Sequence, residues 1–223
     1  MSASSNPASG PSPAPGLARA ERLALCDLMA RLGPDAPTGC AGWTTADLAA
    51  HLVIREYRPD AGPGILFRPL SGYTERVRLA VKDSTPFPQM LDRIREGPPK
   101  ASLWRLPGMD KAGNSVEYFV HHEDVRRAQP DWRPRSLPPD AEERLWRRLK
   151  MARFVLRKVQ VEVTLVRPDG KTIRVSKGAG QARVHGPVGE LMLWALGRGE
   201  VAQVRFTGAA DAVRALADAR WSL

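Results

Sequence analysis

The sequence of 223 residues lacks any long hydrophobic run. No stretch approaches the roughly 18 apolar residues that a membrane-spanning helix needs, so we expect no span and no membrane partner. The first 16 residues, MSASSNPASGPSPAPG, contain neither a basic segment nor an apolar core, which excludes a secretory signal peptide of the usual kind. We therefore expect a cytoplasmic protein.

Cysteine is scarce, because the chain has only Cys26 and Cys40. Two cysteines make no disulfide framework and suit a reducing compartment, although one disulfide between them stays open. Cys26 lies in a helical pattern, where a small buried side chain is favoured over a reactive thiol. Cys40 lies in a loop at no recognisable ligand spacing, so we interpret it as structural.

Motifs of several common activities are also missing. The sequence contains no G-x-S-x-G elbow, no Walker loop and no G-x-G-x-x-G after a strand. Its net charge of +10 comes mostly from arginines that are spread over every helical pattern and mixed with acidic residues. Without a zinc-finger spacing, a basic tract or an aromatic RNA-binding motif, this charge disfavours nucleic acid as a partner.

The periodicity of the first 130 residues predicts helices. Residues 1–15 are mostly Ser, Pro, Ala and Gly and predict a disordered tail, and residues 16–130 predict a helical bundle. We expect helices over 17–32, from Thr45 after a capping box at 44–47, over 73–83, over 88–95 and over 114–128. Residues 84–88 are either a kink or a break between two helices.

A proline-rich stretch at 130–139 marks the best domain boundary, and the pattern changes after it. We expect one long helix over 140–157, then strands over 159–165 and 172–175 joined by a hairpin turn, with Gly178–Gly180 as a turn rather than a phosphate cradle. A helix over 187–196, a strand over 201–206 and a helix over 209–219 follow. Residues 131–223 are therefore predicted to be a small α/β domain, and the fold class α+β.

The segment 114–128, NSVEYFVHHEDVRRA, contains the most chemistry. If Ser115 caps its helix, Glu117 and His121 lie one turn apart on one face. His51 lies at a core-facing position of an earlier helix. Imidazole and carboxylate are ligands of zinc and similar ions, and three protein ligands leave a position for water or substrate. We therefore predict a divalent-metal site of His51, Glu117 and His121; hydrogen bonding in the core and pairing with arginine are the structural alternatives.

Other polar residues near this segment are given lesser roles. We expect His122 to be exposed or to lie just outside the ligands. Glu123 and Asp124 look like surface charge pairs, although Asp124 is spaced to be a hydrogen-bond partner of His121 or a substitute ligand. His185 is interpreted as a polar residue near a helix start.

Two motifs together resemble a known family. GWTTADLAAHL at 42–52 and SVEYFVHHEDVRR at 115–127 resemble the mycothiol-dependent maleylpyruvate isomerase family, part of the DinB-like metal-binding four-helix-bundle superfamily. HGPVGELMLWALGR at 185–198 and VRFTG at 204–208 resemble that family's small α/β domain. The resemblance covers roughly residues 17–223, and its motifs are more specific for fold and metal site than for reaction.

The resemblance implies an N-terminal DinB-like four-helix bundle followed by the α/β domain. It places the metal ligands at His51, Glu117 and His121, the same three residues as above. It further implies Zn²⁺ or another divalent ion, and mycothiol, an actinobacterial thiol, as cosubstrate that attacks an electrophile. The family's C-terminal catalytic arginine has three candidates here: Arg183, Arg198 and Arg205.

These observations favour a metal-dependent thiol transferase or isomerase that acts on a small electrophile with a small-molecule thiol. The alternative is a non-catalytic metal-binding protein with a stress-response or binding role. Exposed faces of a helical bundle would also allow a homodimer. The sequence does not identify the electrophile.

Overall fold

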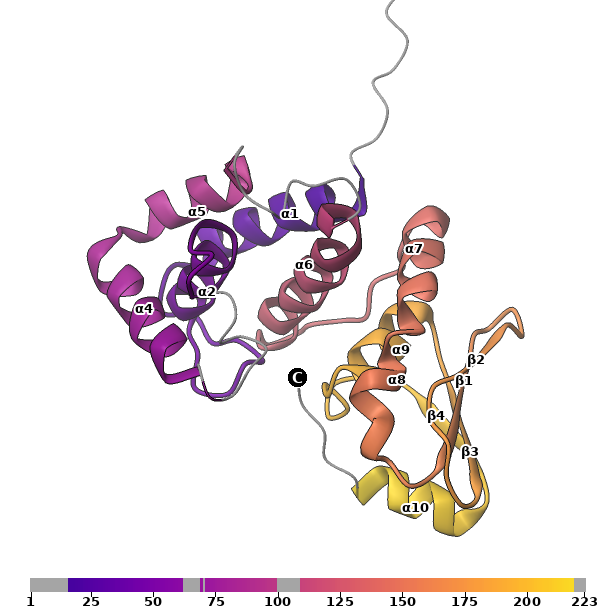
Figure 1. Cartoon of the computed structure of the whole chain (residues 1–223). Coiled ribbons are helices and arrows are strands. Elements are labelled where there is room, and N and C mark those ends of the chain that lie inside the picture. Colours follow the sequence, from indigo (N-terminus) through magenta and orange to yellow (C-terminus); the bar gives the residue numbers. More distant parts are fainter. Residues whose placement is uncertain (1–15, 62–68, 70, 100–108, 219–223) are drawn as a thin grey trace, which may run out of the picture.

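The computed structural model describes residues 16–61, 69, 71–99 and 109–218. The tail predicted at 1–15 lies outside the described residues. The described residues of the first part form five helices: α1 (Leu17–Leu32), α2 (Thr45–Tyr57), α4 (Ser71–Ser84), α5 (Phe87–Glu96) and α6 (Met109–Arg127). Helix α1 packs against α5 and α6, and α2 packs against α4 and α5 (Figure 1).

The start of α2 follows the sequence prediction, and the start of α6 does not. The capping box at 44–47 is present, with the Thr44 N–H donating to Asp47 Oδ2 over 3.0 Å. Helix α6 already begins at Met109, so Ser115 lies inside the helix and does not cap it. The neighbouring Asn114 is fully buried and accepts a hydrogen bond from Arg55 Nη1 over 2.5 Å. The residues expected to begin this helix are therefore interior residues of α6.

The predicted long helix at 140–157 is wrong in detail. The chain forms α7 (Pro139–Leu149), α8 (Ala152–Val155) and the 3₁₀ turn η3 (Leu156–Lys158). Lys150 and Met151, between α7 and α8, keep right-handed helical dihedrals with ψ of −26° and −18°. The path of the helix therefore continues through a tightened turn rather than reversing. Residues 84–88 are a true break, since α4 ends at Ser84 and α5 begins at Phe87.

A four-stranded mixed sheet completes the α+β fold, which confirms the predicted class. The strands are β1 (Glu162–Val166), β2 (Thr172–Arg174), β3 (Gln181–His185) and β4 (Arg205–Gly208), in the order β2-β1-β3-β4. Strands β1 and β3 are parallel, and the other neighbours are antiparallel. Helices α7, α8 and α9 (Val188–Ala195) lie on one side of the sheet, and α10 (Ala210–Asp218) closes the described chain (Figure 1).

Two strand predictions are displaced. The predicted strand 159–165 begins only at Glu162, although Val159 and Val161 are still buried in the core. The predicted strand 201–206 begins at Arg205, because the amides of Val201 and Ala202 both donate to the Arg198 carbonyl in a turn. No bounds were predicted for strand β3, because the prediction gave only a turn at 178–180 between strand segments; Ala182 and Val184 are its buried residues.

Helix α6 lies between the two largest hydrophobic clusters. Tyr118 and Val125 pack with α1, α2 and α5, whereas Phe119 and Val120 join the cluster of α7, α9 and the sheet. Contact with α9 is close: a Cβ at Gly189 would lie 3.1 Å from Phe119 Cζ. Because apolar residues of α6 pack on two sides, polar residues of the same helix, such as His121 and Asp124, are buried as well. Their burial fixes where the candidate site lies. Within the described residues, no helix is long and apolar enough to cross a membrane.

Candidate metal centre

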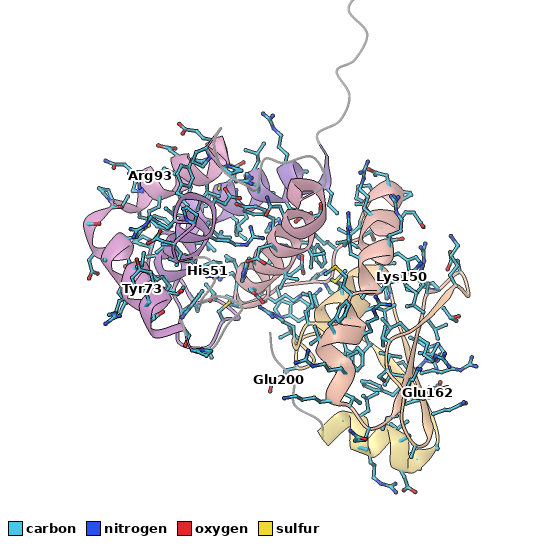
Figure 2. The ribbon with its side chains drawn as sticks, viewed as in Figure 1. His51, Tyr73, Arg93, Lys150, Glu162 and Glu200 are labelled. Carbon is cyan, nitrogen blue, oxygen red and sulfur yellow. The ribbon has the colours of Figure 1, made fainter. Side chains whose placement is uncertain are left out.

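The structure brings together the three residues predicted as metal ligands. His51 comes from α2, and Glu117 and His121 lie one turn apart on α6. Glu117 Oε1 is 3.3 Å from His51 Nε2 and 3.3 Å from His121 Nε2. The three donor atoms all lie within 4.8 Å of one another. His51, labelled in Figure 2, lies between the two helices.

These separations fit a shared ion. Zinc bonds to imidazole nitrogen or carboxylate oxygen are about 2.0–2.2 Å long, which sets ligand atoms of a tetrahedral site about 3.3–3.6 Å apart. The two 3.3 Å distances to Glu117 Oε1 correspond to edges of such a tetrahedron. The side chains of His51 and His121 are 11% and 10% exposed, whereas the Glu117 side chain is 25% exposed. The side of the site at Glu117 is therefore the one nearest to solvent.

Charges around the three donors differ from one donor to the next. Burial lowers the pKa of His51, which keeps its imidazole neutral as a ligand must be. Burial acts to raise the pKa of Glu117, but hydrogen bonds with His121 and His51 outweigh it and hold this pKa well below its usual range. Arg55 Nε also lies 3.4 Å from Glu117 Oε1. The arginine pairing considered for Glu117 is therefore present beside the two imidazoles.

Asp124 orients His121. Its Oδ2 lies 3.0 Å from His121 Nδ1, and the Asp124 side chain is only 1% exposed. A hydrogen bond from Nδ1–H to this carboxylate leaves Nε2 as the atom that faces Glu117 and His51, as in carboxylate–histidine–metal sites. Burial acts to lower the pKa of His121, but hydrogen bonds with Asp124, Cys40 and Glu117 raise it well above its usual range, so an ion at this site would displace the Nε2 proton. The interpretation of Asp124 as a surface charge is wrong, and the alternative role as hydrogen-bond partner of His121 is confirmed.

Cys40 is not a remote structural residue. Its Sγ lies 3.4 Å from Asp124 Oδ2 and 3.9 Å from His121 Nδ1. The loop before α2 is held against α6 because the Gly39 N–H donates to the Asp124 carbonyl over 2.8 Å. Cys40, His121 and Asp124 thus form a second group of possible metal ligands. The sequence spacing gave no sign of this contact, which depends on the fold of the loop.

Arg198 distinguishes the two groups of possible ligands. Its guanidinium donates from Nε to Asp124 Oδ1 over 3.1 Å and from Nη2 to Oδ2 over 2.9 Å. Burial acts to raise the pKa of Asp124, but the hydrogen bonds with His121 and Arg198 lower it. Because the Arg198 guanidinium binds both oxygens of this carboxylate, we assign Asp124 to orientation rather than to ion binding. Of the three arginine candidates, Arg198 reaches the site, whereas Arg183 and Arg205 lie at exposed positions of β3 and β4.

His122 faces away from the candidate ligands. Its Nδ1 lies 2.8 Å from Glu21 Oε2 on α1, and the residue is 7% exposed. Arg135 bonds the same carboxylate over 2.6 Å and Glu123 over 2.7 Å. His122 is therefore neither exposed nor beside the ligands, and Glu123 is buried rather than a surface charge. The predicted exposure of these two residues is wrong because α1 and Arg135 cover this side of α6.

The remaining chemically active side chains lie elsewhere. Burial raises the pKa of the Cys26 thiol to about 12, which confirms its interpretation as an unreactive core residue. The two cysteines are free rather than joined in a disulfide. His185 Nε2 lies 2.8 Å from Thr207 Oγ1 on the sheet.

Comparisons with known proteins give a fold likeness only. No protein-family model matches the chain, and no curated protein matches it. The crystal structure of the mycothiol-dependent maleylpyruvate isomerase is similar with a TM-score of 0.45 and 15% sequence identity, covering 86% of this chain and 90% of that chain. A mutant form of that isomerase is similar with a TM-score of 0.43 and 14% identity over the same shares.

Proposed function

We propose that this chain binds a divalent metal ion through His51, Glu117 and His121 and acts as a thiol transferase or isomerase on a small electrophile. The observation that carries the metal site is the position of Glu117 Oε1, 3.3 Å from Nε2 of each histidine. Neutral His51 and ionised Glu117 are in the protonation states that metal ligands need. His121, whose pKa is raised, would lose its Nε2 proton when the ion binds, while Asp124 holds its Nδ1.

The reaction class rests on the motifs at 42–52 and 115–127, which resemble those of mycothiol-dependent isomerases. A divalent ion held by three protein ligands, with zinc the best fit to this donor set, would lower the pKa of a bound thiol such as mycothiol. The chain itself supplies the ligands, the carboxylate that orients His121, and the partly exposed side at Glu117. Cys40 stays outside the three ligands, on the Nδ1 side of the imidazole.

The same motifs carry three further proposals. Because they cover the start of α2 and the C-terminal part of α6, we propose that the N-terminal helices are a divergent DinB-like four-helix bundle. Mycothiol is proposed as the small-molecule thiol. A cytoplasmic location and a homodimer stay predictions.

Metal content is the first test. We expect the purified chain to hold a divalent ion, by elemental analysis, and His51→Ala and His121→Ala to lose it. His122→Ala is the matched control, since His122 is adjacent on the same helix and equally buried but faces Glu21. Unchanged metal in both ligand variants would refute the site.

Turnover separates the enzyme from its alternative. With metal-loaded protein, mycothiol and a small electrophile such as maleylpyruvate or an activated aryl halide, we expect consumption of the electrophile that requires His121. Stoichiometric binding of metal and thiol without consumption of any electrophile would instead identify a non-catalytic metal-binding protein with a stress-response or binding role.

A further inference from the structure

An exposed ridge along α7, α8 and η3 combines strong positive charge with apolar side chains. Residues 144–158, RLWRRLKMARFVLRK, contain seven Lys and Arg residues and no Asp or Glu. Lys and Arg exceed Asp and Glu by seven in these fifteen residues and by only three in the rest of the chain, so the expectation of an evenly spread charge without a basic tract is wrong. In the same segment, Met151 is 58% exposed and Phe154 is 55% exposed, the two highest values among the exposed large hydrophobic side chains of the described residues.

The charged and apolar side chains share one face of the ridge. The inner face packs into the core at helical spacing, through Leu145, Leu149, Ala152 and Leu156. The outward face repeats every three to four residues and consists of exposed side chains: Arg144, Arg147, Met151, Phe154 and Lys158. Because Lys150 and Met151 keep helical dihedrals, this outward face is not interrupted between α7 and α8.

The positive charges of the ridge are poorly compensated. Arg144 lies 3.7 Å from Asp140, and Arg147 donates to a backbone carbonyl. Among the described parts of the chain, no carboxylate lies within 4 Å of the other basic side chains of the segment: Arg148, Lys150, Arg153, Arg157 and Lys158. Arg153 instead covers the ring of Phe154, with Cζ 4.8 Å from the ring centroid. Figure 2 labels Lys150 at the junction of α7 and α8.

We propose that this ridge, residues 144–158, docks on an anionic lipid surface. Side chains such as Met151 and Phe154 enter the boundary of headgroups and acyl chains, while surrounding lysines and arginines reach lipid phosphates and carboxylates. This peripheral contact differs from a membrane span, but it revises the expectation that membranes are not partners. It is independent of the metal site and of the proposed reaction.

Two other partners fit the ridge less well. Nucleic acid would neutralise the arginines but would leave the projecting Met151 and Phe154 without an apolar environment. In a symmetric pair of chains that meet through this ridge, each run of seven positive charges would face its copy, and like charges oppose association. Charge complementarity together with exposed apolar side chains therefore favours an anionic lipid surface.

Vesicle co-sedimentation tests the proposal with the full chain. We expect binding to mixed phosphatidylcholine–phosphatidylserine vesicles, no binding to phosphatidylcholine vesicles, and weakening as salt is raised. Met151→Ser with Phe154→Ser, and separately Lys150→Gln with Arg153→Gln and Arg157→Gln, should each weaken binding by about tenfold or more. All five side chains are exposed, so thermal unfolding and metal content should stay unchanged.

Matched controls use exposed residues of the helices before α6. Tyr73→Ser with Leu79→Ser removes the other two exposed large hydrophobic side chains, and Arg76→Gln with Arg93→Gln removes exposed charges that have no carboxylate partner among the described residues. Both controls should bind vesicles as the unaltered chain does. Equal binding to neutral vesicles, or equal losses in the controls, would overturn the proposal. So would a ridge-dependent dimer, or tighter ridge-dependent binding of a labelled DNA duplex than of anionic vesicles.

Discussion

Helix α6 presents two buried polar clusters on different faces, and they differ in charge balance. At the metal centre, Glu117 contacts two imidazoles and Arg55, whose Nε lies 3.4 Å from Oε1. On another face, Glu123 accepts hydrogen bonds from three arginines over 2.7 Å each: Arg126, Arg127 and Arg135. A buried carboxylate that is already paired with guanidinium groups has little attraction left for a cation. We infer that the number of guanidinium groups paired with a buried carboxylate, more than the number of donor atoms nearby, separates a metal site from a structural network.

The largest expected effect is the loss of metal affinity in His121→Ala, which we compare with His122→Ala at the adjacent residue. His121→Ala should lower metal affinity by at least about a hundredfold, because the loss of a ligand exceeds the loss of an orienting group. His122→Ala should change metal affinity by less than a few fold but should lower the unfolding temperature, since Glu21 loses a partner. Calorimetric metal titration and thermal unfolding measure the two effects. A similar loss of metal affinity in both variants would contradict the separation of the two faces.

Glu123→Gln tests the structural network. Removing one buried charge from these arginine pairs should cost about 3–5 kcal/mol of unfolding free energy, measured by denaturant titration. Burial acts to raise the pKa of Glu123, but hydrogen bonds with Arg127 and Arg135 lower it below the ordinary 4.5. The stabilisation is therefore complete above the ordinary pKa and is lost as pH falls through the lower, folded value.

The variant gives a matched check on this pH dependence. Because glutamine does not titrate, the stability of Glu123→Gln should fall less steeply than that of the unaltered chain below about pH 4.5. If the two proteins lose unfolding free energy equally as pH falls through the acid range, Glu123 is not the source of this pH dependence.

Asp124→Asn should give a smaller effect, confined to the metal centre. Without the carboxylate, His121 loses the acceptor that fixes its tautomer, and metal affinity should fall about 10–100-fold. Arg198 would also lose its charged partner, so stability should be measured beside affinity. If metal affinity stays the same while stability falls, Asp124 has a structural role only.

Cys40→Ser should have the smallest effect. The thiol lies 3.9 Å from the imidazole nitrogen opposite to the one that faces Glu117, so metal affinity should change by less than about threefold. Metal titration at fixed pH measures this change. A loss as large as that of His121→Ala would assign the ion to Cys40, His121 and Asp124 instead.

The sequence predicted those parts of the site that are local or repeated in regular structure. Glu117 and His121 are four residues apart on one helix, and His51 lies at a core position of another, so helical periodicity alone places their faces. Cys40 and Arg198 lie 84 and 74 residues from Asp124 and reach it through a loop and a helix end. No periodicity specifies such contacts, which depend on how tertiary packing places the ends of elements.

The fold shows the same division. The class α+β followed from patterns that the structure retains, such as the capping box before α2 and the alternating burial of β1. The start of α6 was misjudged because Ser115, the expected cap, lies inside a helix that already begins at Met109. The exposure of His122 was misjudged because its partner Glu21 lies on α1, far from it in the sequence. Arg135, which lies 114 residues from Glu21, binds the same carboxylate and helps to cover this side of α6.

X-ray absorption at the zinc edge of the zinc-loaded chain, without added thiol, tests the central claim most directly. If His51, Glu117 and His121 bind the ion, we expect nitrogen and oxygen ligands alone at about 2.0–2.2 Å, with the multiple scattering of two imidazoles. A sulfur ligand at about 2.3 Å would show that Cys40 binds the ion and would contradict the assignment to His51, Glu117 and His121.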